Sequence, residues 1–176
     1  MTEHYELVVR TTGTPAEPST AEVDAQWIAR AIELATANVA SGGGPFGALI
    51  VRDGGLIAEG QNRVTANLDP TAHAEVVAIR RACEALGTFD LSGHVIYSSC
   101  EPCPMCLGAV YWARLDRLVF ANSRADAAAI GFDDALIYDE IPKPIEVRLL
   151  PTRHQPSAEA TAVFADWLKK TDRIPY

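Results

Sequence analysis

The chain has 176 residues, a formal net charge of −8 and 48% hydrophobic residues. This length suits one domain with one sizeable core, and the sequence holds no apolar run of the roughly 18 residues that a membrane span needs. The acidic N-terminus lacks the apolar segment of a signal peptide, and no long basic run is available to bind a phosphate backbone. We therefore expect a cytoplasmic protein that binds neither a membrane nor nucleic acid.

The first twenty residues, 1–20, are expected to form an N-terminal extension, and residues 21–176 a single domain. In chain order, the predicted elements are a helix at 21–40, strands at 46–51 and 56–61, a helix at 70–86, a strand at 94–98, a helix at 104–113, a strand at 117–121, a helix at 125–129, a strand at 145–150 and a helix at 157–169. Ser19 followed by Glu22 is a capping-box pattern that begins the first helix. A hairpin followed by alternating helices and strands predicts an α/β layered domain with a mixed sheet.

Two short motifs contain residue types that bind zinc. Cys103 and Cys106 are three apart at the start of a predicted helix, with Pro104 suited to its first position, so both thiols can face one ion. His73 and Glu75 are two apart, and in mid-helix their side chains would diverge. They can converge on one ion only from the first turn of a helix. We therefore expect two helix N-termini to point at a common metal.

The number of protein ligands indicates a catalytic site. A structural zinc ion normally has four ligands, whereas one His and two Cys leave a position for a water molecule, which the metal makes acidic. Glu75 is then a nearby carboxylate that can move protons. Two alternatives stay open: a thiol–disulfide site formed by the Cys-x-x-Cys motif alone, and a structural zinc with Cys100 or His94 as fourth ligand.

The combination of His-x-Glu with Pro-Cys-x-x-Cys resembles the signature of the zinc-dependent base deaminases, the cytidine-deaminase-like superfamily. Within this group the sequence is most similar to the bacterial guanine deaminases, on the segments 43–48, 69–75, 99–108, 111–114 and 131–134. The resemblance implies a three-layer α/β/α domain with a five-stranded mixed sheet. It also implies one Zn²⁺ per chain, bound by His73, Cys103 and Cys106, with Glu75 as the catalytic residue.

The resemblance further implies a substrate pocket. Asn62 would hydrogen-bond the base, Phe46 and Trp112 would line the pocket, and Asp134 would be a second acidic group near the reacting amine, with Asp133 as the alternative. The C-terminus resembles a tail that closes the pocket of a neighbouring subunit. We expect this role for Tyr176 in a homodimer with exchanged C-terminal segments, although the tail could instead act within its own chain.

The implied reaction is the hydrolysis of guanine to xanthine and ammonia. The closest alternatives are related amino-heterocycles: a triazine such as ammeline, cytosine or a purine nucleoside. Deamination of adenosine in transfer RNA is a further alternative, because those enzymes share Pro-Thr-Ala-His-Ala-Glu, but the acidic charge of this chain argues against it. A zinc-stabilised module without catalytic activity is the remaining class.

Overall fold

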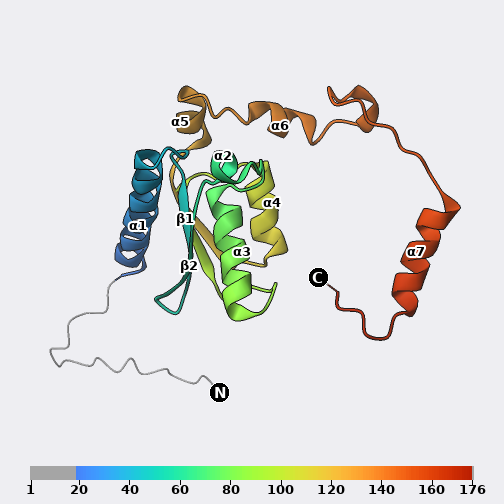
Figure 1. Ribbon diagram of the computed structural model, residues 1–176, viewed down its shortest axis with the longest axis horizontal. Helices are drawn as coiled ribbons and strands as arrows, with labels where there is room; N and C mark the ends of the chain where they lie inside the picture. The colour runs from blue at the N-terminus through green and yellow to red at the C-terminus, as the bar shows by residue number, and fades with distance from the viewer. Residues whose placement is uncertain (1–18, 176) are drawn as a thin grey trace, which may run out of the picture.

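The computed structural model describes residues 19–175, and its central feature is a mixed four-stranded sheet. The strands are β1 (Gly47–Arg52), β2 (Gly55–Gln61), β3 (Val95–Cys100) and β4 (Arg117–Asn122), in the order β2-β1-β3-β4. β1 is antiparallel to β2 and to β3, whereas β3 and β4 are parallel. Helix α1 (Thr20–Ala40) covers one face, and α3 (Ala74–Leu86) and α4 (Pro104–Trp112) cover the other (Figure 1).

The alternation of side chains along β1 produces a core on each face of the sheet. Leu49 and Val51 pack with residues of α1, whereas Ala48 and Ile50 pack with residues of α3 and α4. On the second face α3 lies directly on β2: a Cβ atom at Gly60 would be 2.1 Å from the carbonyl oxygen of Ala74. The first turn of α3 is therefore held against the sheet.

Helix α1 begins as its capping box predicts. The Ser19 hydroxyl accepts a hydrogen bond from the Glu22 amide, and the Glu22 carboxylate accepts one from the Ser19 amide. Ser19 and Thr20 are thus the cap and the first residue of the helix, although the predicted extension included them. The remainder of that extension, residues 1–18, lies outside the described residues.

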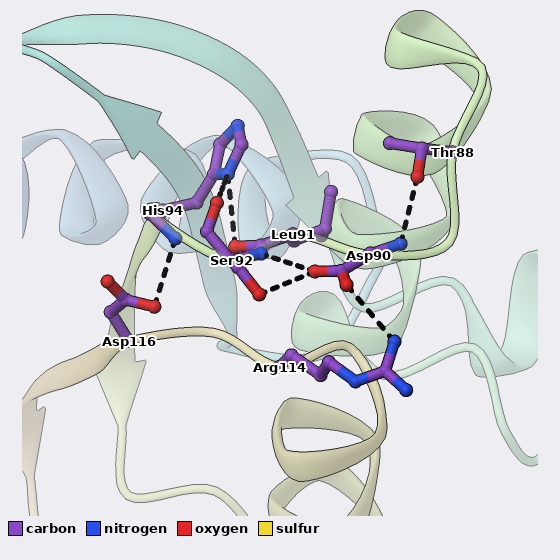
Figure 2. A network of polar contacts seen from close by, with 8 residues as sticks. Thr88, Asp90, Leu91, Ser92, His94, Arg114 and Asp116 are labelled. Atoms are coloured by element: carbon purple, nitrogen blue, oxygen red, sulfur yellow. Dashed lines mark hydrogen bonds and ion pairs between the residues drawn. The ribbon is translucent and has the colours of Figure 1, made fainter. Parts of the chain in front are cut away.

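A polar network fixes the connection between α3 and β3 (Figure 2). The Asp90 carboxylate accepts hydrogen bonds from the Ser92 amide (2.9 Å) and from Arg114 (3.1 Å), which follows α4. Nδ1 of His94 lies 3.0 Å from the carbonyl oxygen of Leu91 and 3.1 Å from that of Ser92. These contacts tie the start of β3 to the C-terminal end of α4.

The elements after β4 pack differently. They are α5 (Arg124–Ala129), α6 (Ala135–Glu140), the 3₁₀ helix η1 (Ile145–Val147) and α7 (Ala158–Lys169), and none of them contains a buried residue. Figure 1 shows α7 standing apart from the sheet and its helices. The predictions of α5 and α7 are confirmed, whereas α6 and the short α2 (Val64–Asn67) were not predicted.

The predicted fifth strand at 145–150 is wrong, because that segment forms η1 and an extended stretch instead. The sheet of the described residues has four strands. A strand needs a neighbouring strand to satisfy its backbone groups, whereas in this segment the Leu149 amide donates to the Glu140 carboxylate (2.6 Å). Leu149 and Leu150 remain 70% and 75% exposed. Within residues 19–175, no helix is both long and apolar enough to cross a bilayer.

Candidate metal and active site

The first half of the site is built at the start of α3. The Asp69 carboxylate accepts hydrogen bonds from the Thr71 amide (2.8 Å) and hydroxyl (2.7 Å), so the chain turns there. The helix therefore begins at Ala74, whereas the sequence had suggested a start at Pro70. His73 is the N-cap residue with extended backbone angles, and Glu75 lies in the first turn. This start allows both side chains to converge, as predicted.

The second half of the site is built at the start of α4. Cys103 is the N-cap residue, Pro104 occupies the first turn, and Cys106 follows, completely buried. Pro104 suits this position because its missing N–H would have no intrahelical partner there. Both halves of the site are thus helix N-termini, where the helix dipole favours negatively charged groups.

The three predicted metal ligands meet at one point. Nδ1 of His73 lies 3.6 Å from the Cys103 sulfur and 3.5 Å from the Cys106 sulfur. The ligand atoms of all three residues lie within 4.8 Å of one another. Tetrahedral zinc with Zn–S near 2.3 Å and Zn–N near 2.0–2.1 Å separates sulfur and nitrogen ligands by roughly 3.5 Å. The side chains therefore fit a zinc ion at its ordinary bond lengths.

Neither candidate fourth ligand joins this cluster. Among the described residues, the metal-ligand cluster consists of His73, Cys103 and Cys106. The Cys100 sulfur lies 3.7 Å from the carbonyl oxygen of Ser123, and His94 is buried at the opposite end of β3, within the network of Figure 2. Three protein ligands leave one tetrahedral position open, which is the pattern of a catalytic zinc site.

The electrostatics of the cluster suit both metal binding and proton transfer. The hydrogen bond from the Cys106 thiol lowers the pKa of Cys103 to about 4, so Cys103 is a thiolate at neutral pH. Glu75 is only 6% exposed, and burial raises the pKa of its carboxyl group. A carboxyl group whose pKa moves toward neutrality can accept and return a proton during a reaction.

A cavity of about 360 Å³ opens in front of these groups. Its lining includes most of the residues predicted for the site: Phe46, Asn62, His73, Glu75, Cys103 and Asp134. The Oδ1 atom of Asn62 accepts a hydrogen bond from the Val64 amide (3.2 Å). Because this contact uses the oxygen, the Nδ2 group of Asn62 is the part of the amide available to donate to a ligand.

Of the predicted pocket residues that the structure describes, Trp112 is not among those that line the cavity. Trp112 is 69% exposed and ends α4, nine residues from the metal-binding end. Since a helix rises about 1.5 Å per residue, Trp112 lies roughly 14 Å along the helix axis from Cys103. Trp112 is therefore remote from the cavity of the single chain, and its role in the pocket stays a prediction. Tyr176 lies outside the described residues.

The segment after β4 contributes residues to which the sequence assigned no role. The ring of Phe132 contacts that of Phe46 edge to face, with centroids 4.9 Å apart. The Arg124 guanidinium lies 4.5 Å from the Tyr138 ring centroid, which links α5 to α6. The match over 131–134 was the sequence signal for Phe132, whereas Arg124 had none.

The two candidate acidic residues of the loop before α6 differ in their contacts. Asp133 and Asp134 both line the cavity. The Asp133 carboxylate accepts a hydrogen bond from the amide of Ala135, the first residue of α6 (2.9 Å). Burial, followed by the negative charge of Cys103, raises the pKa of Asp134. Asp134 is the N-cap residue of α6, but its carboxylate makes no cap hydrogen bond and lies within electrostatic reach of Cys103.

Comparisons with known proteins agree with this site. The model of the cytidine and deoxycytidylate deaminase zinc-binding region matches residues 21–122. Guanine deaminase from Bacillus subtilis is 51% identical over 151 residues, which are 85% of this chain and 97% of that protein. A tRNA-specific adenosine deaminase from Haemophilus influenzae is 40% identical over 119 residues, covering 64% and 69% of the two chains.

Solved structures show the same relationship. The X-ray structure of Bacillus subtilis guanine deaminase superposes with a TM-score of 0.85 at 50% identity, covering 86% of this chain and 98% of that one. A structure of guanine deaminase from Nitrosomonas europaea gives a TM-score of 0.61 at 34% identity, with coverage of 81% and 83%. The fold, the three metal ligands and these matches lead to one conclusion: this chain belongs to the zinc-binding cytidine and deoxycytidylate deaminase family, in which it is similar to the guanine deaminases.

Proposed function

We propose that this protein hydrolyses guanine to xanthine and ammonia. The observation that carries the proposal is the match to Bacillus subtilis guanine deaminase, which extends over 97% of that protein at 51% identity. The cavity supports it, because its size suits a small heterocycle and its lining contains aromatic rings beside a few polar groups.

The chemistry divides between the metal and the residues around it. A zinc ion bound by His73, Cys103 and Cys106 would supply Lewis-acid activation of a water molecule near neutral pH. Glu75 accepts a proton from that water, delivers it to a ring nitrogen of the base, and later helps to protonate the departing ammonia. The water oxygen becomes the carbonyl oxygen of xanthine, and the C–N bond to the amino group breaks.

The remaining residues of the cavity hold the base. Nδ2 of Asn62 donates to an acceptor on the heterocycle, and the rings of Phe46 and Phe132 restrict the plane in which the base can lie. We assign Asp134 to the reacting amine, because its carboxylate makes no cap hydrogen bond, lines the cavity and lies within electrostatic reach of Cys103. These contacts would select the base by leaving polar groups unpaired when a poorer substrate binds.

A substrate panel scored by ammonia release tests the proposal. The panel contains guanine, guanosine, adenine, cytosine, cytidine and ammeline, and we expect guanine to have the highest kcat/KM. A clearly higher value for a triazine or a nucleoside would replace guanine as the substrate while keeping the deaminase reaction. Release of ammonia from none of them would contradict the enzymatic assignment.

The panel needs an RNA arm because relatives of this chain include tRNA-specific adenosine deaminases. We propose that this protein does not act on RNA: its net charge is −8, and contacts with phosphates depend on basic side chains. A transfer RNA should give no salt-dependent gel shift and no inosine. Either signal at physiological salt would favour the RNA substrate instead.

We further propose a cytoplasmic homodimer with exchanged C-terminal segments. Every residue from 149 to 175 is exposed in the single chain. On α7 the exposed apolar residues Val163, Phe164, Trp167 and Leu168 recur at helical spacing, which describes a face that normally packs on something. A second copy would bury this face and bring Tyr176 to the mouth of the partner's cavity. Sedimentation of the full chain and of a chain ending before α7 should show a dimer and a monomer, respectively.

A further inference from the structure

Asn38, in the last turn of α1, lies outside the cavity but holds two parts of its wall. Its side chain is completely buried. Nδ2 donates to the carbonyl oxygen of Gly44 and to that of Asn62, both at 2.8 Å. Gly44 and Asn62 each line the cavity, and they come from different connections, one before β1 and the other after β2.

The chemistry of this contact requires an NH₂ group. Two backbone carbonyls face the same side-chain atom, so only a group with two hydrogens can satisfy both. Within residues 19–175, no group donates to the Oδ1 atom of Asn38. The amide therefore acts at this position through its nitrogen, and a carboxylate or a hydrocarbon of the same size would leave both carbonyl oxygens unpaired.

The surrounding chain is shaped to admit this amide. A Cβ atom at Gly43 would lie 2.5 Å from Nδ2 and 2.6 Å from Oδ1 of Asn38. The Gly43 amide in turn donates to the backbone carbonyl of Asn38 at 2.8 Å. Gly43 is thus glycine because the buried amide occupies the space of a side chain.

The two connections also contact each other, and Asn38 completes the arrangement. The Asn62 amide donates to the carbonyl oxygen of Phe46 at 3.1 Å. The position of a Cβ atom on Gly44 would be 3.3 Å from Cγ of Asn62. Asn62 is therefore held by Phe46 on one side and by Asn38 on the other, which fixes where its side chain leaves the backbone.

We propose that Asn38 is a positioning residue for substrate binding: by holding the carbonyls of Gly44 and Asn62, it aims the Asn62 amide at the base. The inference rests on the function proposed above for Asn62. An error of about 1 Å in the position of a binding group can cost as much as a hundredfold in rate. A remote residue with this role should therefore change KM and kcat/KM without touching the substrate.

A double-mutant cycle between Asn38→Leu and Asn62→Ala tests the proposal. It is measured on whichever amine the wild-type enzyme turns over best, so an error about guanine does not affect its outcome. We expect Asn38→Leu to lower kcat/KM roughly tenfold, mainly through KM, when Asn62 is present. In the Asn62→Ala background the same change should have less than about a twofold effect. Independent, multiplicative losses would show that Asn38 is only structural.

Two further variants keep the test decisive if Asn38→Leu folds poorly. Gly43→Ala retains the Asn38 amide but displaces it. This variant should therefore reproduce the increase in KM, and it should likewise have little effect in the Asn62→Ala background. Gln61→Leu is the matched control, because Nε2 of Gln61 also joins β2 to α1, through the carbonyl of Leu34 at 2.8 Å, without lining the cavity. Its kcat/KM should stay near wild type. An equal loss in Gln61→Leu would overturn the proposal, and zinc content and melting temperature are measured for each variant.

Discussion

The part of the chain up to β4 and the segment after it are built in different ways. Every buried residue of the described chain lies between Ala31 and Ala113, and both hydrophobic cores are there. The segment from Arg124 to Pro175 has no buried residue, although Asp134 and Phe132 line the cavity. The first part can therefore build the metal site by itself, whereas the second can complete the pocket but depends on other contacts for its stability.

The contacts that hold the second part over the cavity are few and lie near its beginning. They include the ring pair Phe46–Phe132 and the hydrogen bond from the Arg124 amide to the Glu101 carboxylate (3.0 Å). The metal ligands and Glu75 thus come from the starts of helices that pack on the sheet, whereas the later residues that line the cavity come from a segment without buried residues. Four experiments test this division of labour.

Loss of a metal ligand should have the largest effect. Cys103→Ala removes one of three protein ligands, and because metal binding is coupled to folding, we expect loss of zinc, of activity and of thermal stability together. Metal analysis and thermal unfolding measure the result. Cys83→Ala, a half-buried cysteine on α3 outside the cluster, should retain zinc and activity. Full zinc occupancy in Cys103→Ala would contradict the ligand assignment.

Replacement of Glu75, the proposed proton carrier, should lower catalysis and leave the fold intact. Glu75→Gln keeps the size of the side chain but cannot accept a proton, so we expect a decrease in kcat of about a hundredfold or more. Zinc content and melting temperature should remain close to wild type, since Glu75 is not among the three ligands. Near-normal turnover with bound zinc would show that Glu75 is not the proton carrier.

Removal of the chain end tests the second part directly. Deleting residues 174–176 should leave the fold and zinc intact, because the cores lie elsewhere, and should lower kcat/KM by about tenfold through loss of the lid. Mixing this truncated chain with Glu75→Gln tests for exchange between subunits. If tails act on the partner, the heterodimer pairs an intact Glu75 site with a full-length tail, and activity partly returns. If each tail closes its own site, mixing restores nothing.

The smallest expected effect concerns a contact inside the first part. Arg117 donates to the Asp24 carboxylate at 2.6 and 2.7 Å, and Tyr97 donates at 2.7 Å. Hydrogen bonding from Arg117 lowers the pKa of Asp24 below its ordinary value. Since the pKa is lower in the folded state, the resulting stability is complete above the unfolded pKa of about 3.9 and is lost as the pH falls through the folded pKa.

Asp24→Asn should therefore lower the melting temperature by about a few degrees at pH 7. The difference from wild type should shrink as the pH falls below about 4, and kcat/KM should not change. Asp53→Asn is the matched control, because the Asp53 side chain is 91% exposed beside Arg52. A loss of stability in Asp24→Asn that is independent of pH would show that the carboxylate charge is not what matters.

Much of the active site could be predicted because its signals are local. The capping box of Ser19, the three-residue spacing of Cys103 and Cys106, and the closeness of His73 to Glu75 each describe one helix turn, whose geometry hardly depends on the rest of the fold. Among these local signals, the start of α3 was predicted too early. The Asp69 side chain accepts a hydrogen bond from the Thr71 amide and forms a turn, so the helix begins at Ala74.

What the tertiary structure decided are the relationships between distant segments. The segment 145–150 was predicted as a strand, but a strand also needs a neighbouring strand, and within residues 19–175 none lies beside this segment. Trp112 ends α4, away from the metal-binding end, and Phe132 reaches the cavity from a later loop. The sequence by itself thus determined the metal ligands, the place of Glu75 beside them and the α/β class, because these follow from short-range spacing and periodicity. Only the packing of separate elements decided the number of strands, the cavity wall and the burial of Asn38, because these depend on which surfaces meet.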